Sequence, residues 1–99
     1  MGIKKPALYI MTNKRNGTLY MGVTSNLLQR VFEHKTGVGS EFCLKYQCNM
    51  LVWYHLFEVM IDAIHMEKLL KRGSRTRKLR LIEEMNPLWN DLYSDIYHQ

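Results

Sequence analysis

The sequence has little cysteine, no long hydrophobic run and no repeated or low-complexity segment. Its two cysteines, Cys43 and Cys48, are too few for the disulfide framework of a small secreted domain. No apolar stretch approaches the roughly 20 residues of a membrane-spanning helix. We therefore expect a soluble, cytoplasmic protein without a membrane partner, in which residues 1–99 form a single domain.

Positive charge is in excess, and it is concentrated in two segments. The chain has 14 Lys and Arg residues against 9 Asp and Glu residues, a formal net charge of +5. Residues 1–35 carry a net charge of +5 and residues 67–80 one of +6, while residues 36–66 and 81–99 are net −2 and −4. Such segments favour a polyanionic partner. A basic helix face that is merely solvated explains the second segment equally well.

The apolar pattern predicts three strands and three helices. The strands are expected at residues 7–12, 18–23 and 50–57, and the helices at residues 25–35, 63–72 and 74–85. Asn16-Gly17 is a hairpin signal between the first two strands. Ser25, Asp62 and Ser74 are the expected helix N-caps. Residues 36–49 are predicted to be irregular.

The order of these elements predicts the topology of the sheet. A strand that follows a helical crossover runs parallel to the second strand, so in an antiparallel sheet it must lie beside the first strand. We therefore predict an α/β fold in which helices flank a three-stranded antiparallel sheet of order 2-1-3, with a core that spans residues 7–92.

Two pairs of side chains are candidates for chemistry. Tyr9 and Tyr20 stand on the two hairpin strands, where cross-strand pairing brings both phenols to one side of the sheet. Arg30 and His34 are four residues apart and share a helix face. Each pair can also be without a functional role, because tyrosines are common in strands and most Arg/His pairs at this spacing lie on the surface by chance.

Glu67 is the only acid among the seven basic residues of the 67–80 segment. It is either an ion-pair partner of Lys71, four residues further along the helix, or an oxygen ligand for Mg²⁺, which takes one or two carboxylates together with waters and phosphate. A zinc site is excluded, because Cys43 and Cys48 are spaced too widely and no second ligand pair follows. His55, inside an apolar run, is expected in the core.

The combination of motifs resembles the GIY-YIG nuclease superfamily, and in particular its small single-domain bacterial members. The resemblance spans residues 7–92 and rests on Ala7-Leu8-Tyr9, Tyr20-Met21-Gly22, Thr24-x-Asn26-Leu27-x-x-Arg30-x-x-x-His34, Phe42-x-x-Lys45-Tyr46, Leu51-Val52-Trp53-Tyr54, Glu67-Lys68-x-Leu70-Lys71 and Asn86-Pro87-x-Trp89-x-Asp91-Leu92. The sequence departs from the pattern at Ala7-Leu8 in place of Gly-Ile, at Met21 in place of Ile and at Gly73, where small members often carry Trp.

The resemblance implies hydrolysis of DNA phosphodiester bonds with one divalent cation, Mg²⁺ or Mn²⁺, held by Glu67. The implied catalytic residues are Tyr9, Tyr20, Arg30, His34 and Glu67, which we expect to line one concave surface. Arg30 would face the charge on the phosphoryl group, and a tyrosine, helped by His34, would position or activate water. Either tyrosine can be that residue. Asn86 resembles the last polar position of the family's site only loosely.

The resemblance implies that the basic residues bind DNA phosphates. The residues expected to hold the flanking phosphates are Lys45, Lys68, Lys71, Arg75 and Lys78. No base-reading element is present, so specificity is either for a DNA structure such as a branch, flap or nick, or is supplied by a targeting protein partner. We predict an endonuclease that acts in DNA repair or recombination. The alternatives are a nucleic-acid-binding module of the same fold with little or no cleavage, and a protein adaptor.

Overall fold

The computed structural model describes residues 4–98 and contains one three-stranded antiparallel sheet of order β2-β1-β3. Its strands are β1 (Ala7–Thr12), β2 (Leu19–Thr24) and β3 (Met50–Leu56). The central strand β1 is buried along its whole length, whereas β2 and β3 are the two edges. The predicted fold class and strand order are therefore confirmed.

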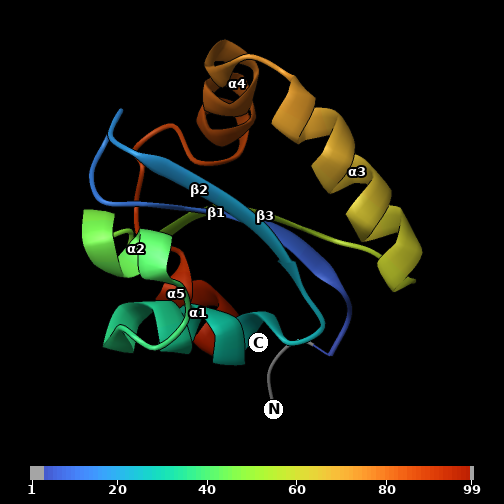
Figure 1. Ribbon diagram of the computed structural model, residues 1–99, viewed down its shortest axis with the longest axis horizontal. Coiled ribbons are helices and arrows are strands. Elements are labelled where there is room, and N and C mark those ends of the chain that lie inside the picture. The colour runs from blue at the N-terminus through green and yellow to red at the C-terminus, as the bar shows by residue number, and fades with distance from the viewer. Residues whose placement is uncertain (1–3, 99) are drawn as a thin grey trace.

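Five helices cover the two faces of the sheet (Figure 1). They are α1 (Leu27–Thr36), α2 (Glu41–Tyr46), α3 (Met60–Arg72), α4 (Arg75–Met85) and α5 (Tyr93–Tyr97). Helices α1, α2 and α5 lie on one face, and α3 and α4 lie on the other. No helix among residues 4–98 is long and apolar enough to cross a membrane.

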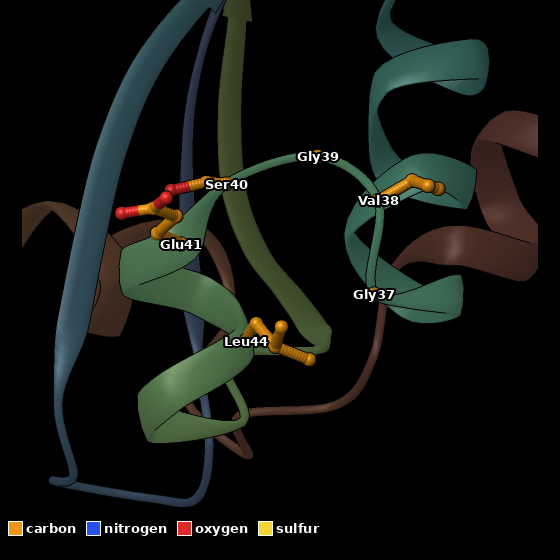
Figure 2. Close-up of a pocket in the computed structure, with 6 residues that line it drawn as sticks. All are labelled: Gly37, Val38, Gly39, Ser40, Glu41 and Leu44. Atoms are coloured by element: carbon orange, nitrogen blue, oxygen red, sulfur yellow. The ribbon is translucent and has the colours of Figure 1, made fainter.

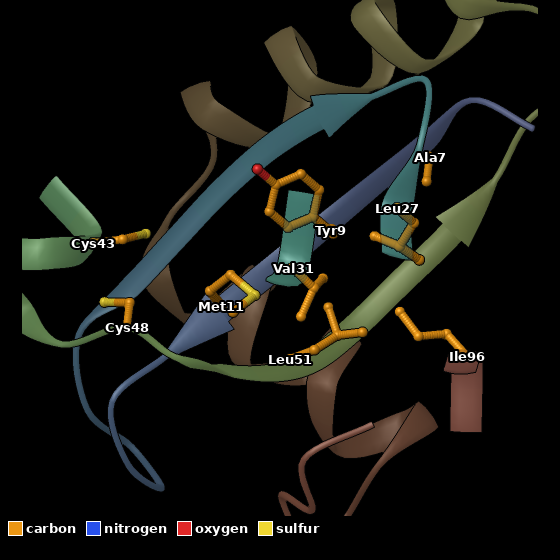
Figure 3. Packing of buried hydrophobic residues seen from close by; sticks show 9 residues of the cluster. All are labelled: Ala7, Tyr9, Met11, Leu27, Val31, Cys43, Cys48, Leu51 and Ile96. Carbon is orange, nitrogen blue, oxygen red and sulfur yellow. The ribbon is translucent and has the colours of Figure 1, made fainter. Parts of the chain in front are cut away.

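Alternate residues of β1 point into two separate cores, as the two-residue period of a strand requires. Tyr9 and Met11 face α1, α2 and α5, where they pack with Leu27 and Val31 of α1 (Figure 3). Leu8 and Ile10 face α3 and α4, where they pack with residues such as Leu70 and Ile82. The first core contains a tyrosine and both cysteines, while the second is apolar apart from the tryptophan indole groups.

Several helix boundaries differ from the prediction. Asn26, not Ser25, caps α1, because its side chain accepts a hydrogen bond from Gln29 N. Helix α3 begins at Met60, so Asp62 lies in its first turn, where a carboxylate still interacts favourably with the helix dipole. Ser74 caps α4 as predicted. Helices α2 and α5 were not predicted, since each is shorter than two helical turns and has hardly any periodic pattern.

The segment after α4 is fixed to β3 by two polar side chains. Asn86 is buried; its amide nitrogen donates to the carbonyl oxygens of Val52 and Asn90. Asp91 accepts from Leu51 N at 3.1 Å and forms an ion pair with Lys35 of α1. These contacts give Asn86 a structural task, because its hydrogen-bonding capacity is used within the fold.

The prediction that His55 lies in the core is wrong. Its side chain is exposed on β3 rather than buried in the core, with its ring stacked at 6.4 Å on Trp53 and edge-on at 4.8 Å to Phe57. Strand β3 is an edge strand, so an apolar run of sequence there does not bury every residue on both faces.

Candidate active site

A buried hydrogen bond between Tyr9 and His34 lies at the centre of the candidate site. The Tyr9 hydroxyl is 2.9 Å from His34 Nε2, and both side chains are almost completely buried. Strand pairing sets Tyr9 opposite Gly22 and Met11 opposite Tyr20, so the two tyrosines are diagonal neighbours on one face. Their ring centroids are 6.4 Å apart, and the Tyr20 ring is 5.3 Å from His34.

Arg30 completes this cluster from α1, one helical turn before His34. Its Nε lies 3.2 Å from the Glu33 carboxylate, and its guanidinium is close enough to Tyr9 to favour the ionised phenol. Burial and the neighbouring Tyr20 have the larger effect, so the pKa of Tyr9 is raised well above its ordinary value. Arg30 alone therefore does not make Tyr9 a base at neutral pH.

His34 is held in its neutral form. Its pKa is lowered from the ordinary value, first by burial and then by the positive charge of Arg30, while Glu33 acts in the opposite direction. Because Arg30 donates toward the Tyr9 oxygen, we assign the phenol proton to the hydrogen bond with His34 Nε2. The Nε2 lone pair is then the acceptor, and Nδ1 is left without a hydrogen-bond partner among residues 4–98.

Two glycines allow the chain to approach this pair closely. A Cβ atom on Gly22 would lie 2.8 Å from the Tyr9 hydroxyl oxygen, and one on Gly39 would lie 2.7 Å from His34 Nδ1. Gly39 belongs to the loop between α1 and α2, which borders a hollow of about 200 Å³ (Figure 2). From sequence, Gly22 was only part of a motif and Gly39 lay in a segment predicted to be irregular. In the structure, the loop that contains Gly39 closes one side of the imidazole.

An aromatic row extends from the cluster to the surface, and its role was missed from sequence. The Tyr20 ring is 5.7 Å from Phe42, and Phe42 is 4.8 Å from Tyr46, both on α2. The four-residue spacing of Phe42 and Tyr46 was a visible signal, because it places both rings on one face of a helical turn. It went unused because residues 36–49 were expected to be irregular.

Glu67 does not join the other four predicted residues. Helix α3 packs on the face of the sheet opposite to Tyr9 and His34, so the five residues do not line one concave surface as expected. Tyr9 and His34 are moreover buried, at 0% and 4% exposure. The Glu67 carboxylate is 3.2 Å from Lys71 Nζ, which is the ion pair that sequence spacing allowed. Its side chain is 17% exposed, so it is mostly covered by its surroundings.

The donor set around Glu67 suits only one kind of metal site. Among residues 4–98 there is no group of three or more His, Cys, Asp or Glu side chains that could enclose a metal ion. A hydrated Mg²⁺ needs only one or two protein carboxylates when a substrate phosphate supplies further oxygens. Glu67 therefore fits a cation that binds together with substrate, and does not fit a tightly held structural metal.

The predicted phosphate-binding residues divide between the two faces. Those on α3 and α4 are Lys68, Lys71, Arg75 and Lys78, whereas Lys45 lies on α2. Lys71 is exposed and paired with Glu67. The Arg75 guanidinium donates to the carbonyl oxygens of Asn16 and Gly17 at 2.9 and 2.6 Å, so this residue also anchors α4 to the hairpin turn.

Comparison with known proteins agrees with this architecture. The family model described as the GIY-YIG catalytic domain matches residues 5–80. A UPF0213 protein of Staphylococcus haemolyticus is 34% identical over 81% of this chain and 96% of its own length. A UPF0213 protein of Pediococcus acidilactici is 38% identical over 67% of this chain and 69% of its own length. No solved structure matches. The chain therefore belongs to the GIY-YIG nuclease family.

Proposed function

We propose that this protein is a Mg²⁺- or Mn²⁺-dependent endonuclease that hydrolyses DNA phosphodiester bonds and acts in repair or recombination. The observation that carries the proposal is the cluster of Tyr20 and Arg30 around the buried Tyr9–His34 hydrogen bond. Such a cluster offers a cation for a phosphoryl group and a proton acceptor beside a phenol. A protein that only binds DNA needs neither arrangement.

Each residue of the cluster is suited to one task. The Arg30 side chain is 38% exposed and can reach a phosphate while it remains next to Tyr9. There it would stabilise the negative charge that develops on phosphorus in the transition state. Tyr9 is completely buried, so it cannot contact an attacking water in this arrangement. Tyr20 is half-buried and is the phenol that we assign to the water.

The Tyr9–His34 pair would act as the proton acceptor behind Tyr20. His34 is neutral and its Nε2 lone pair faces the Tyr9 hydroxyl, so the imidazole can accept a proton at that atom. The ring of Tyr20 lies against both members of the pair, at 6.4 Å from Tyr9 and 5.3 Å from His34. A proton released near Tyr20 would pass to the Tyr9 oxygen while the Tyr9 hydroxyl proton moves to His34 Nε2, so that Tyr9 stays neutral and His34 becomes the imidazolium.

Glu67 would hold the divalent cation. The bound cation would polarise a phosphoryl oxygen and stabilise the departing 3′ oxygen. Lys71 competes for the same carboxylate, so the ion pair at 3.2 Å would have to loosen when the cation and substrate bind. The pair is partly exposed and of the kind that contributes little to stability, so this change has a small cost.

Edge strand β2 is where the two faces can act on one phosphate. Helix α3 packs against β1 and β2 from one side, while Tyr20 and Arg30 lie on the other side. Because β2 is an edge of the sheet, a phosphodiester that lay along it would be accessible to both groups. The basic residues of α3 and α4 would then contact phosphates further along the strand.

This placement predicts salt-sensitive binding that depends little on sequence. Each neutralised phosphate on duplex DNA contributes about 0.9 to the negative slope of log K against log salt. Replacing Lys71 by Ala should lower the slope by about one unit. Arg75→Ala should lower it less, because part of that guanidinium already binds the hairpin turn. An affinity that is independent of salt would mean that the basic segment is only solvated.

The second candidate function is a nucleic-acid-binding module with little or no cleavage. It is favoured by the position of Glu67, which is ion-paired and lies on the opposite face of the sheet from Tyr9. A purely adaptor role is favoured by none of the described contacts of residues 4–98.

Cleavage of a substrate panel separates these functions. The panel contains duplex, single-stranded, flap and four-way-junction DNA, assayed with Mg²⁺, with Mn²⁺ and with a chelator. We expect cation-dependent cleavage of at least one structure. If the wild-type protein binds DNA but cuts nothing with either cation, the endonuclease proposal fails and the binding module replaces it.

A further inference from the structure

Helix α2 presents two aromatic rings to solvent beside the candidate active site. The side chains of Phe42 and Tyr46 are 40% and 41% exposed, although large aromatic residues contribute most to stability when they are buried. Their centroids are 4.8 Å apart, so they form one continuous aromatic surface. Helix α2 is anchored below by Cys43, which is buried in the core.

We propose that Phe42 and Tyr46 form a stacking platform for an unpaired nucleotide next to the scissile phosphate. The inference rests on the proposed function and specifies its substrate class as DNA with unpaired bases. Base–aromatic stacking is the usual way in which proteins hold unpaired nucleotides, and it works for every base because each has a π-face.

Continuity with the catalytic cluster is the first argument. The row of rings runs from His34 through Tyr20 and Phe42 to Tyr46, with successive centroids 5.3, 5.7 and 4.8 Å apart. A nucleotide whose phosphate lies at Tyr20 would therefore have its neighbour within reach of the two exposed rings. The platform is thus placed for a nucleotide adjoining the cleavage position rather than a distant one.

Charge on α2 supports a nucleotide rather than a peptide partner. Lys45 is exposed, and its Nζ is 5.3 Å from the centre of the Tyr46 ring. An ammonium group beside an aromatic face suits a ligand that has both a base and a phosphate. The helix also carries one acidic residue, Glu41, whose side chain lies next to Ser40 at the start of the helix (Figure 2).

The chemistry of stacking selects unpaired over duplex DNA. Bases inside a duplex already stack on their neighbours, and an aromatic side chain can stack on one only after it has been freed. Exposed rings therefore gain most from a single strand, a flap or the strand end at a branch. This preference comes from the shape of the substrate and needs no base-reading element.

The test compares four single substitutions on the same helix, of which the fourth, Phe42→Leu, is a second variant of Phe42. The probes are a single strand and a flap, each with 2-aminopurine next to the branch or at the matching position, and a fully paired duplex of the same sequence. Binding is measured with a chelator present, so that cleavage plays no part. The variants are Phe42→Ala and Tyr46→Ala, with Leu44→Ala as the control, because Leu44 is 60% exposed on α2 but not aromatic.

We expect each aromatic variant to bind the single strand and the flap about tenfold more weakly, and to reduce the quenching of 2-aminopurine. Duplex binding should change less than twofold, and Leu44→Ala should leave all affinities near the wild-type values. Phe42→Leu, which keeps an apolar side chain, should behave like Phe42→Ala and guards against a folding defect.

Equal losses on duplex and unpaired DNA, or no loss with either aromatic variant, would overturn the platform. Its failure is separate from failure of the endonuclease proposal, because wild-type cleavage is scored independently on the same probes. A protein that cuts DNA but shows no aromatic-dependent preference retains the proposed function without the platform. A protein that shows the preference but cuts nothing retains the platform as part of a binding module.

Discussion

The two faces of the sheet differ in the polarity of their cores and in the charge of the residues at their surfaces. The face covered by α1, α2 and α5 buries Tyr9 and His34, whose side chains form a buried hydrogen bond with each other. The face covered by α3 and α4 has an apolar core and carries Glu67 and most of the Lys and Arg residues of the 67–80 segment on its surface. Under the proposed function, proton transfer takes place on the first face, and cation binding and most of the phosphate contacts on the second.

Under the proposed function, neither face of the sheet is a complete nuclease site by itself. Proton acceptors such as His34 need a dry, fixed environment, which requires burial and precise packing. Phosphate- and cation-binding groups need access to solvent and tolerate a looser arrangement. The central strand separates these environments, and we propose that one substrate reaches both of them at edge strand β2.

The largest effect is expected from Arg30→Ala. This change removes the cation beside Tyr9, and loss of one preorganised charge of this kind typically slows a reaction by about 100- to 1000-fold. Affinity for DNA should fall only modestly, because a single phosphate contact is lost. Gln29→Ala, an exposed change on the same helix, is the control and should cut at the wild-type rate. A normal rate for Arg30→Ala would remove the α1 face from the chemistry.

Replacing each tyrosine by Phe should show which one affects only the cleavage rate and which one also affects the free energy of unfolding. Tyr20→Phe removes the half-buried phenol and should slow cleavage by about 100-fold with little effect on folding, as for loss of a group that assists proton transfer. Tyr9→Phe should slow cleavage as well, and should also lower the free energy of unfolding by about 1–3 kcal/mol, because His34 loses its buried partner. Cleavage assays measure the rates of both variants, and urea unfolding measures their free energies of unfolding. A stable, fully active Tyr9→Phe protein would contradict the relay.

A smaller effect is expected when Gly39 is replaced by Ala. The added methyl would lie 2.7 Å from His34 Nδ1 and would push the imidazole away from Tyr9, which should slow cleavage by about tenfold. The same change in a His34→Ala background should have almost no further effect, because the ring that it displaces is gone. Additive losses in the double variant would show that Gly39 acts through the loop and not through His34.

The smallest expected effect is the contribution of His34 to the pH dependence of the free energy of unfolding. The pKa of His34 is lower in the folded protein than its ordinary value of about 6.5, so below that pH the unfolded chain binds a proton that the folded chain does not. Stability should therefore fall as pH decreases from about 6.5 toward the folded-state pKa, and His34→Asn should lose this part of the decline. His55→Asn, at an exposed histidine, is the control. Equal pH profiles for His34→Asn and the wild type would contradict a buried neutral imidazole.

The sequence predicted those parts of the fold that depend on local pattern. Alternating and helical periodicities located the three strands and the long helices, and the connection rule for antiparallel strands led to the order β2-β1-β3. The pairing of Tyr9 with Tyr20 and of Arg30 with His34 followed from the same periods. These residues are close in sequence or on adjacent strands, so simple geometry sufficed.

Sequence patterns did not predict how the helices pack on the sheet or which residues this packing brings together. Helix α2 is six residues long, is capped by Ser40 and buries only Cys43, so its one sequence signal, the four-residue spacing of Phe42 and Tyr46, was too short to predict a helix. The face on which α3 packs decides where Glu67 lies, and that choice depends on the whole core rather than on the spacing around Glu67. The close contact of Gly39 with His34 is likewise a property of the folded loop.

The most direct test of the account is a double-mutant cycle on Arg30 and Glu67, which lie on the two different faces. Cleavage rate and DNA affinity are measured with Mg²⁺ for the wild type, Arg30→Ala, Glu67→Ala and the double variant, on the substrate that is cut best. If both residues act on one phosphate across β2, each single change should nearly abolish cleavage, the double change should add little, and Glu67→Ala should bind DNA at least as tightly as the wild type. Wild-type cleavage by Glu67→Ala would contradict the account, because the α3 face would then take no part in the reaction.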